Sequence, residues 1–497
     1  MADTSGTSRA HGARPRVAAQ VLAPTLRTFA VSAGLAWAVA FVVIGLRFDL
    51  QLFADGSLFS YAVAAQDAWA FHWHNISGRV FVFWYAHLPA ETYAGLFRDP
   101  HGGVVLYGFL FFVAPLLGLG ATFAADKSSG RVIFVYACAS TACLCPLVFG
   151  FPTEVWVAHA LFWPTLAVCH YARSGLRGHA LVFAALLAMT LSHCGAIIFS
   201  CAILMTLALR GTRDPAFLRA GGMFFIVMAV WTVIKGTLPP DDYLAKVLFN
   251  AAMKVFDPAI LYGDLVLLLS ATLGGYLAAF AVLRRVSAER AHIHAAFAVA
   301  FALGVYWIWF DHALHGENRY YLRTALLVLT PAFGLAAALQ VLAAEDRLRF
   351  APAAMARLLT AATGERAARV ALGALAVVML VHVVETVKFV DVWAHYTSAV
   401  RRLAVGTASD PSLGDERFVS ARHIGNDLNR LSWFSTTQYL SVLVAPRFAP
   451  NRLVLDPDSN FFWLSCRVAT ANFRADRALS AHSRDLIRTD ACLHRKQ

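Results

Sequence analysis

The sequence predicts an all-α polytopic membrane protein, with about eleven transmembrane helices and a small α/β or mixed soluble C-terminal domain. Three observations predict this class. Of the 497 residues, 59% are hydrophobic and only 14% are charged, and the mean hydropathy is +0.59. The apolar residues fall in runs of roughly 16–24, and each run is long enough to cross a hydrocarbon core about 30 Å thick. Basic residues collect in every second connection between the runs, as they do on the cytoplasmic side of membrane proteins.

Residues 1–27 form a polar, basic segment before the first apolar run. Its four arginines place the N-terminus in the cytoplasm. No small-residue cleavage site follows the first run, so that run is interpreted as a signal anchor. The membrane domain then covers residues 28–388. Its spans are predicted at about 28–46, 103–123, 132–150, 155–172, 220–235, 264–283, 293–310, 324–343 and 370–388, with two further crossings within 179–209.

The stretch 179–209 is too long for one straight crossing and is flanked by arginines on both sides. Two basic flanks indicate two crossings, which requires a break in the helix. Ser192–Gly195 is the segment where the break is expected. Each half is then short, so the pair is not expected to reach the full depth of the membrane.

Two regions are predicted outside the membrane on the extracytoplasmic face. The first is the long loop 47–102, which is rich in aromatic and acidic residues and is expected to form short helices along the membrane surface. The second is the tail, 389–497, interpreted as a soluble extracytoplasmic domain. Its apolar strings YLSVLVAP and RLVLDP, bounded by turn signals, predict strands.

The net charge of +12 does not indicate a nucleic-acid partner, because topology explains why Arg and Lys lie in the connections. The cysteines in apolar runs are interpreted as small buried side chains. They are Cys138, Cys143, Cys145, Cys169, Cys194 and Cys201. Cys466 and Cys492 are the pair in the tail, and their spacing permits a disulfide without requiring one.

The segment DLQLFADGSLFSY, directly after the first span, contains the candidate base Asp55. A carboxylate held at a membrane surface among aromatic residues is partly desolvated, which suits general-base chemistry. The alternative is an Asp-Gly turn that caps the next helix through Ser57. Asp49 is the second candidate. It lies closer to the membrane, and its spacing from Arg47 predicts an ion pair and a structural role.

A second polar cluster, ENRYYLR, stands just before the span at 324–343. Arg319 and Arg323 offer planar forks that match phosphate oxygens, and Tyr320 can stack or donate a hydrogen bond. Lys246, from the outer loop 235–263, completes the predicted substrate-binding set. The alternative is an interfacial belt of aromatic residues with snorkelling arginines. No residue is assigned as a metal ligand.

At these two clusters the chain resembles the GT-C superfamily of polytopic glycosyltransferases. The resemblance implies transfer of a sugar from a polyprenyl-phosphate donor to a glycan or lipid acceptor outside a bacterial inner (plasma) membrane. It implies that Asp55, with Asp49 as the alternative, is the catalytic acidic residue of the first outer loop. It also implies that Arg319 and Arg323 bind the carrier phosphate. The chain departs from the tandem acidic motif of many members, which leaves metal dependence open, with a divalent cation as the candidate cofactor.

The sequence leaves other functions open. A transporter or flippase needs ionisable residues near the bilayer midplane, where the sequence offers mainly His159, His193 and His294. A buried histidine bonded to a neighbouring helix explains each of them equally well. An inverted-repeat transporter should also show a partner for the break at 192–195, and none is visible. A non-catalytic membrane assembly protein and, among enzymes, an O-antigen polymerase or ligase are further alternatives.

Overall fold

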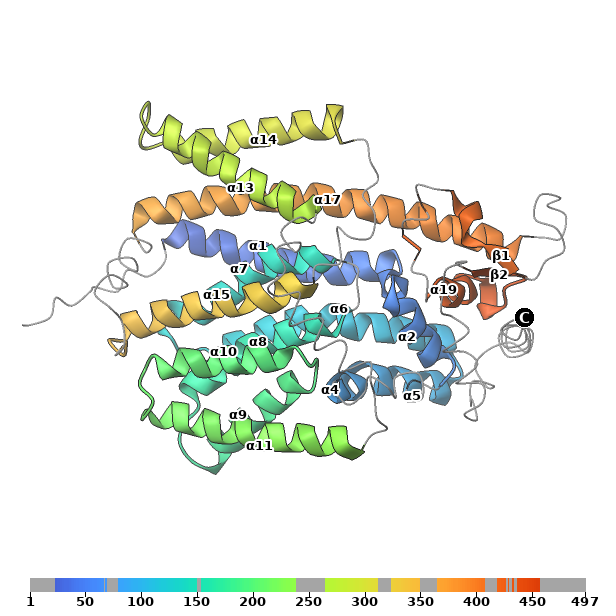
Figure 1. Cartoon of the computed structure of the whole chain (residues 1–497), viewed down its shortest axis with the longest axis horizontal. Coiled ribbons are helices and arrows are strands. Elements are labelled where there is room, and N and C mark those ends of the chain that lie inside the picture. The colour runs from blue at the N-terminus through green and yellow to red at the C-terminus, as the bar shows by residue number, and fades with distance from the viewer. Residues whose placement is uncertain are drawn as a thin grey trace, which may run out of the picture.

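The computed structural model describes residues 23–66, 68, 79–149, 153–237, 264–311, 323–348, 364–406, 418–425, 428, 431–432 and 436–455. Long helices lie side by side across this part of the chain (Figure 1). Within it, eight helical segments are long and apolar enough to cross a membrane. They belong to α1 (Pro24–Arg47), α6 (Pro100–Ala125), η4 to η5 through α7 (Ser129–Val148), α11 (Pro215–Thr237), α13 (Asp264–Leu283), α14 (Ala291–Trp309), α15 (Arg323–Ala344) and α17 (Glu365–Val405).

A polytopic, all-α membrane protein is therefore confirmed, whereas the count of eleven crossings stays a prediction. The other predicted crossings correspond to α8 (Glu154–Tyr171), α9 (Leu176–Thr190) and α10 (Ala196–Ala208). The helix does break between residues 190 and 196, as the basic flanks predicted. At 1.5 Å per residue, α9 and α10 are each only about 20 Å long, so each is shorter than the hydrocarbon core is thick.

Small residues bring the central helices into close contact. A Cβ added at Gly34 of α1 would meet the Cys138 carbonyl oxygen of α7 at 2.5 Å, and one at Gly118 of α6 would meet the Ala160 carbonyl oxygen of α8 at 2.4 Å. Phe41 and Trp156 stack beside these contacts with their ring centroids 3.6 Å apart. Close approach of backbones through glycine is how helices pack where water supplies no hydrophobic driving force.

The loop 47–102 is helical where it is described. It contains η1 (Leu50–Leu52), α2 (Asp55–Ala64), and a helical run made of α4 (Val80–Val82), the π-turn η3 (Phe83–His87) and α5 (Leu88–Phe97). Helices were expected here, but α2 does not lie on an open surface. All of its residues from Gly56 to Ala64 are buried, because α6 and α19 (Thr437–Leu443) pack against it.

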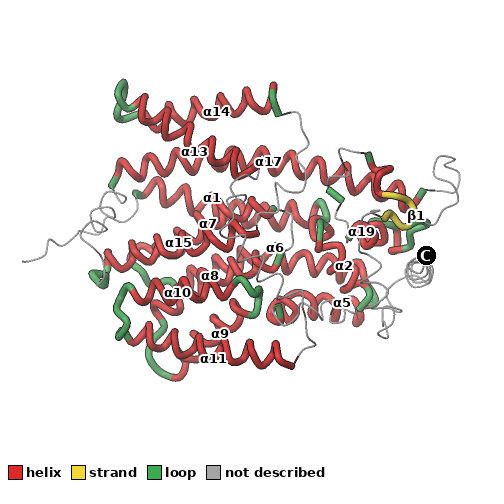
Figure 2. Tube along the Cα trace, viewed as in Figure 1, coloured by secondary structure: helices red, strands yellow, loops and turns green. Residues whose placement is uncertain are grey.

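The tail begins inside a helix. α17 continues without interruption from Glu365 to Val405, so the boundary expected at residue 389 falls within it. Beyond it lie β1 (Phe418–Ser420), η8 (Ala421–Ile424), α19, η9 (Pro446–Phe448) and β2 (Leu453–Leu455), and β1 pairs with β2 in parallel (Figure 2). The strand predicted from RLVLDP is confirmed, and the strand predicted from YLSVLVAP is wrong.

Burial explains the error at YLSVLVAP. Every residue of α19 is buried, so the segment shows no polar face from which a helical period could be read. Ser57 of α2 donates to the Thr436 carbonyl oxygen (3.1 Å), and Tyr61 packs on Tyr439. The described part of the tail is thus joined to α2 rather than standing apart from the membrane helices.

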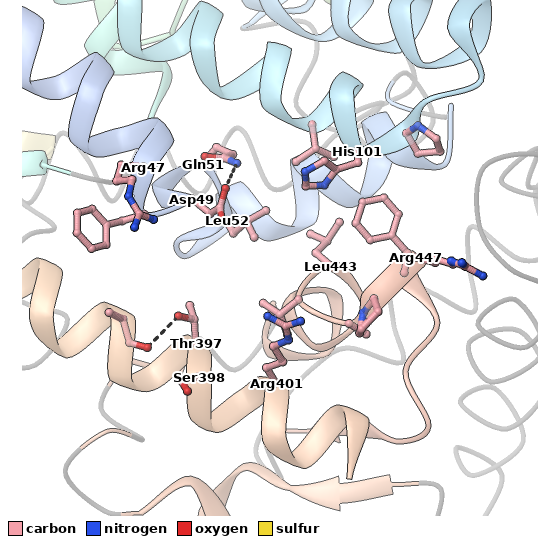
Figure 3. A pocket seen from close by; sticks show the side chains of 18 of the residues that line it. Arg47, Asp49, Gln51, Leu52, His101, Thr397, Ser398, Arg401, Leu443 and Arg447 are labelled. Atoms are coloured by element: carbon pink, nitrogen blue, oxygen red, sulfur yellow. Dashed lines mark hydrogen bonds between the residues drawn. The ribbon is translucent and has the colours of Figure 1, made fainter. Parts of the chain in front are cut away.

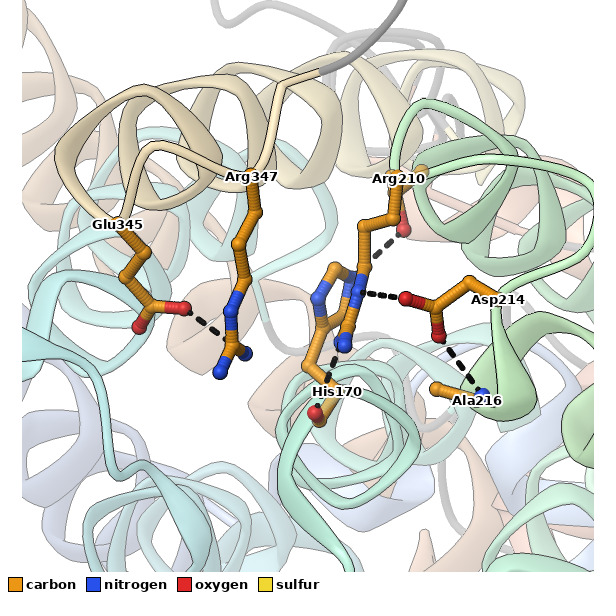
Figure 4. Close-up of polar contacts among 7 residues, drawn as sticks. His170, Arg210, Asp214, Ala216, Glu345 and Arg347 are labelled. Carbon is orange, nitrogen blue, oxygen red and sulfur yellow. Dashed lines mark hydrogen bonds and ion pairs between the residues drawn. The ribbon is translucent and has the colours of Figure 1, made fainter.

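A polar network ties helix ends together at the opposite end of the bundle (Figure 4). Arg210 pairs with Asp214 (3.2 Å) and donates to the His170 carbonyl oxygen (3.1 Å). Glu345 pairs with Arg347 (3.2 Å) and accepts from the Tyr171 hydroxyl (2.6 Å). The network joins the C-terminal ends of α8, α10 and α15. Because the basic connections lie at this end of the bundle, we call it the inner end, and we call the end at Arg47 the outer end.

Among the membrane cysteines, one differs from the expectation. Cys138, Cys145, Cys169 and Cys194 are buried and Cys143 is half-buried, but Cys201 is exposed on α10. A thiol is apolar enough for a lipid-facing surface, so the exposure does not conflict with a membrane helix.

Candidate functional site

The turn between α1 and α2 positions both predicted carboxylates with strained backbone. Asp49 has φ of 51°, a left-handed conformation that Asp tolerates. Ala54, immediately before Asp55, has φ of 52° and ψ of −128°, a conformation that glycine adopts far more readily than alanine. Strain of this kind costs about 1–3 kcal/mol and persists only where the surrounding packing enforces it. Packing of Phe53 against Phe389 and Trp393 of α17 supplies that enforcement.

Asp49 is exposed to solvent. Its Oδ1 accepts a hydrogen bond from Gln51 Nε2 (3.2 Å), and it makes no ion pair with Arg47. The predicted Arg47–Asp49 pair is therefore wrong. The reason is geometric: Arg47 ends α1, the chain turns sharply at Asp49, and the carboxylate follows the turn toward η1.

Asp55 is the first residue of α2 and is half-buried. The alternative in which Ser57 caps this helix is wrong, because Ala54 is the N-cap and no side chain caps the helix. The Ser57 hydroxyl donates to the carbonyl oxygens of Ala54 (3.0 Å) and Thr436 (3.1 Å) instead. A carboxylate in the first turn is stabilised by the positive end of the helix dipole.

A largely buried ion pair joins the first loop to the start of α8. Arg79 Nη1 and Glu154 Oε1 are 2.5 Å apart, and their side chains are 12% and 3% exposed. Tyr107 of α6 lies within electrostatic range of Asp55, Arg79 and Glu154. Cys194, at the junction of α9 and α10, is within range of the same Arg79 and Glu154. We call these five residues the Arg79–Glu154 cluster.

His87 closes one side of this cluster from the π-turn η3. Its ring is 5.0 Å from that of Tyr107 and 5.6 Å from that of Phe59. Burial, reinforced by the charge of Arg79, lowers the pKa of His87 to about 3. His87 is therefore neutral at physiological pH. π-Turns inside helices frequently mark functional sites.

The start of α15 approaches the same region. The side chain of Leu327 lies against Gly195, where an added Cβ would stand 2.8 Å from its Cδ2. The Phe81 amide, just after Arg79, donates to the Leu191 carbonyl oxygen (3.1 Å) and joins the first loop to the α9–α10 junction. α15 begins at Arg323, four residues before Leu327. Arg319, Tyr320 and Lys246, and the side chain of Arg323, lie outside the described residues.

Sequence reasoning missed Arg79 and Glu154 as functional candidates. A usable signal existed for Glu154, because it is the only carboxylate in the sequence between Asp126 and Asp214. A lone acidic residue in a long apolar stretch is expensive and therefore marks a site. Across the described ranges, no group of three or more His, Cys, Asp or Glu side chains converges as metal ligands would.

A separate cavity of about 820 Å³ opens at the outer end (Figure 3). Its walls come from the end of α1 and η1, the start of α6, the late part of α17, and the segment from α19 to η9. Asp49 lines it, whereas Asp55 does not. Three arginines from separate elements also line it, namely Arg47, Arg401 and Arg447.

Comparisons with protein-family models, with curated proteins and with solved structures found no match. The function is accordingly argued from the residues of this chain and their arrangement.

Proposed function

We propose that the protein is an integral membrane glycosyltransferase that moves a sugar from a polyprenyl-phosphate donor to a glycan or lipid acceptor on the outer face. One observation carries the proposal. Asp55, after the first span, belongs to the Arg79–Glu154 cluster, and Leu327 of α15, far away in the sequence, contacts Gly195 beside Cys194 of the same cluster. A transfer of this kind needs an acidic group and phosphate-binding arginines in one place, and we infer that the arginine-rich segment directly before α15 reaches this cluster.

Asp55 acts as the general base in this scheme. Its carboxylate takes the proton of the acceptor hydroxyl while the hydroxyl oxygen attacks the anomeric carbon of the sugar. The bond between that carbon and the phosphate oxygen breaks, and polyprenyl phosphate leaves with the bonding electron pair. Arg319 and Arg323, with Tyr320 and Lys246, hold the leaving phosphate, where stabilising the developing charge contributes most to the rate.

Burial favours Asp55 over Asp49 as the base. Asp55 is half-buried, whereas Asp49 is exposed. Partial burial favours a role for a carboxylate in proton transfer. The strained backbone at Ala54 also fixes the position of Asp55 relative to the end of α1.

The transporter alternative gains little from its candidate histidines. His159 Nε2 bonds with the Ser140 hydroxyl (2.9 Å), and His193 Nδ1 accepts from the Gly195 amide (3.0 Å). His294 is exposed on the outside of α14, which contacts α13 and α17. Two of the three are thus satisfied structural histidines, and the third does not face the bundle interior.

The test is turnover by the purified full-length protein in detergent, supplied with polyprenyl-phosphate sugars and a membrane extract as the source of acceptor. Asp55→Asn is nearly isosteric and should lower turnover by about 10²–10⁴-fold, the usual contribution of a general base. Donor binding and thermal stability should stay close to those of the parent protein. Asp49→Asn is the matched comparison and should cost less activity.

The outcomes separate the alternatives. A larger loss in Asp49→Asn than in Asp55→Asn would move the base to Asp49 within the same reaction. Unchanged turnover in both variants would refute the role of this acidic segment. If no polyprenyl-phosphate sugar is consumed under any condition, the transferase proposal itself is wrong.

A further inference from the structure

We propose that the outer cavity is a binding site for the phosphate-bearing headgroup of an amphiphile, contacted by Arg47 and Arg401. This site is distinct from the Arg79–Glu154 cluster and does not depend on the proposed transfer reaction. Four features of the cavity lead to it: its charge, the direction of its arginines, its depth relative to the membrane, and its apolar wall.

The first feature is positive charge that has no carboxylate partner. Arg47, Arg401 and Arg447 line the cavity, and within the described ranges none of them makes a hydrogen bond or an ion pair. The two carboxylates of the wall are already engaged. Asp49 accepts from Gln51 Nε2, and Asp99 accepts from the Gly102 amide (2.9 Å) as the N-cap of α6. Guanidinium forks without a carboxylate partner suit the oxygens of a phosphate group.

The arginines do not all face the same way (Figure 3). Arg401 rises from α17 toward the opposite wall, Arg47 lies at the α1 end of the cavity, and Arg447 points outward from the cavity. Arg47 and Arg401 thus come from opposite walls, and they are the contacts that we assign.

The position of the cavity relative to the membrane indicates what kind of molecule carries the anion. Trp393 of α17 donates its indole N–H to the Phe48 carbonyl oxygen (2.8 Å), which sets the end of α1 level with Trp393. α1 is long and apolar enough to cross the hydrocarbon core and ends at Arg47, so this level is the edge of the core. Arg401 is two helical turns further along, roughly 12 Å at 1.5 Å per residue. The cavity therefore reaches from the edge of the hydrocarbon core into the layer where lipid headgroups lie.

Part of the remaining wall is apolar. Leu52, Val104, Leu443, Val444 and Phe448 line the cavity alongside the arginines. An inorganic ion would leave this surface wet, whereas the glycerol and first methylene groups of an amphiphile would cover it. The volume of about 820 Å³ is also within the range of small-molecule sites and far larger than a single ion requires.

The test measures binding of a short-chain phosphatidylglycerol to the purified full-length protein in a neutral detergent. Arg47→Gln and Arg401→Gln should each weaken binding about tenfold or more, because each loses a charge-assisted contact. Arg422→Gln is the matched control, since Arg422 is exposed on η8 and does not line the cavity. Its affinity should equal that of the parent protein.

A variant that is expected to strengthen binding shows that weaker binding in the arginine variants does not come from misfolding. Asp49→Asn removes a negative charge from the wall, so it should tighten binding of the anion, which a damaged fold would not do. The short-chain diacylglycerol without phosphate should not bind. Glycerol phosphate binding as tightly as the lipid would overturn the assignment to an amphiphile. Equal lipid affinity of the parent protein and of both arginine variants would overturn the site altogether.

Discussion

Arginines at the two ends of the bundle have different surroundings. At the inner end, Arg210 contacts Asp214 and a backbone carbonyl, and Arg347 contacts Glu345. Arg131 likewise donates to the carbonyl oxygens of Phe123 and Asp126. At the outer cavity, Arg47 and Arg401 have no such partner within the described ranges. The difference separates arginines that hold the fold together from arginines that remain available to a ligand.

Between these extremes stands the buried Arg79–Glu154 pair of the outer end. Replacing Glu154 with Leu removes this carboxylate from Arg79 while the guanidinium stays buried, so stability should fall by about 3–5 kcal/mol. The double variant Arg79→Met/Glu154→Leu should recover most of the loss. Thermal unfolding in detergent measures both. A loss below about 1 kcal/mol in the single variant would show that the pair is not structural.

The inner network should respond more weakly, and only in stability. Arg210→Ala removes an ion pair and a hydrogen bond from a side chain that is 11% exposed, which should cost about 1.5–3 kcal/mol. Arg213→Ala is the control, because Arg213 is exposed nearby on the same connection. Loss of phosphatidylglycerol binding in Arg210→Ala, at unchanged stability, would contradict the division of roles between the two ends.

The last expected effect is a pH dependence that belongs to the outer end. Because the pKa of His87 falls from 6.5 to about 3 on folding, the unfolded chain binds the extra proton below pH 6.5. Neutral His87 therefore leaves the free energy of unfolding at its full value above pH 6.5. Between pH 6.5 and 3, this free energy falls by about 1.4 kcal/mol for each pH unit that the pH is lowered. Melting temperatures at pH 7, 6 and 5 measure this slope. His87→Phe should flatten it, and an unchanged slope in that variant would assign the pH dependence to other groups.

The membrane part was predictable because its physics is local. The length and composition of each apolar run are enough to predict a membrane helix. The arginines on both sides of 179–209 were enough to predict the break near Ser192–Gly195. The tail was less predictable. Thr437–Leu443 is buried on all sides by elements distant in sequence, so its apolar string gave no period, and a helix was taken for a strand.

The candidate site was predictable only in part, for a related reason. Asp49 and Asp55 stand directly after a span, where a single sequence can recommend them. Arg79 and Glu154 become candidates only because they pair with each other across 75 residues. Arg401 becomes a candidate only because it lines a cavity whose opposite wall includes η1. Pairing across such distances is a property of the folded chain, and no pattern within a short segment reports it.

The uninterrupted length of α17 has a mechanical consequence. Its 41 residues make a rod of roughly 60 Å, about twice the thickness of the hydrocarbon core. A tilt of about 5° about the middle of this rod would displace a tip 30 Å away by roughly 3 Å. The backbone of Ala404, near that tip, accepts hydrogen bonds from the amides of Asn451 and Arg452. Small rocking motions of α17 within the bilayer would therefore be magnified in the extramembrane segments that it carries.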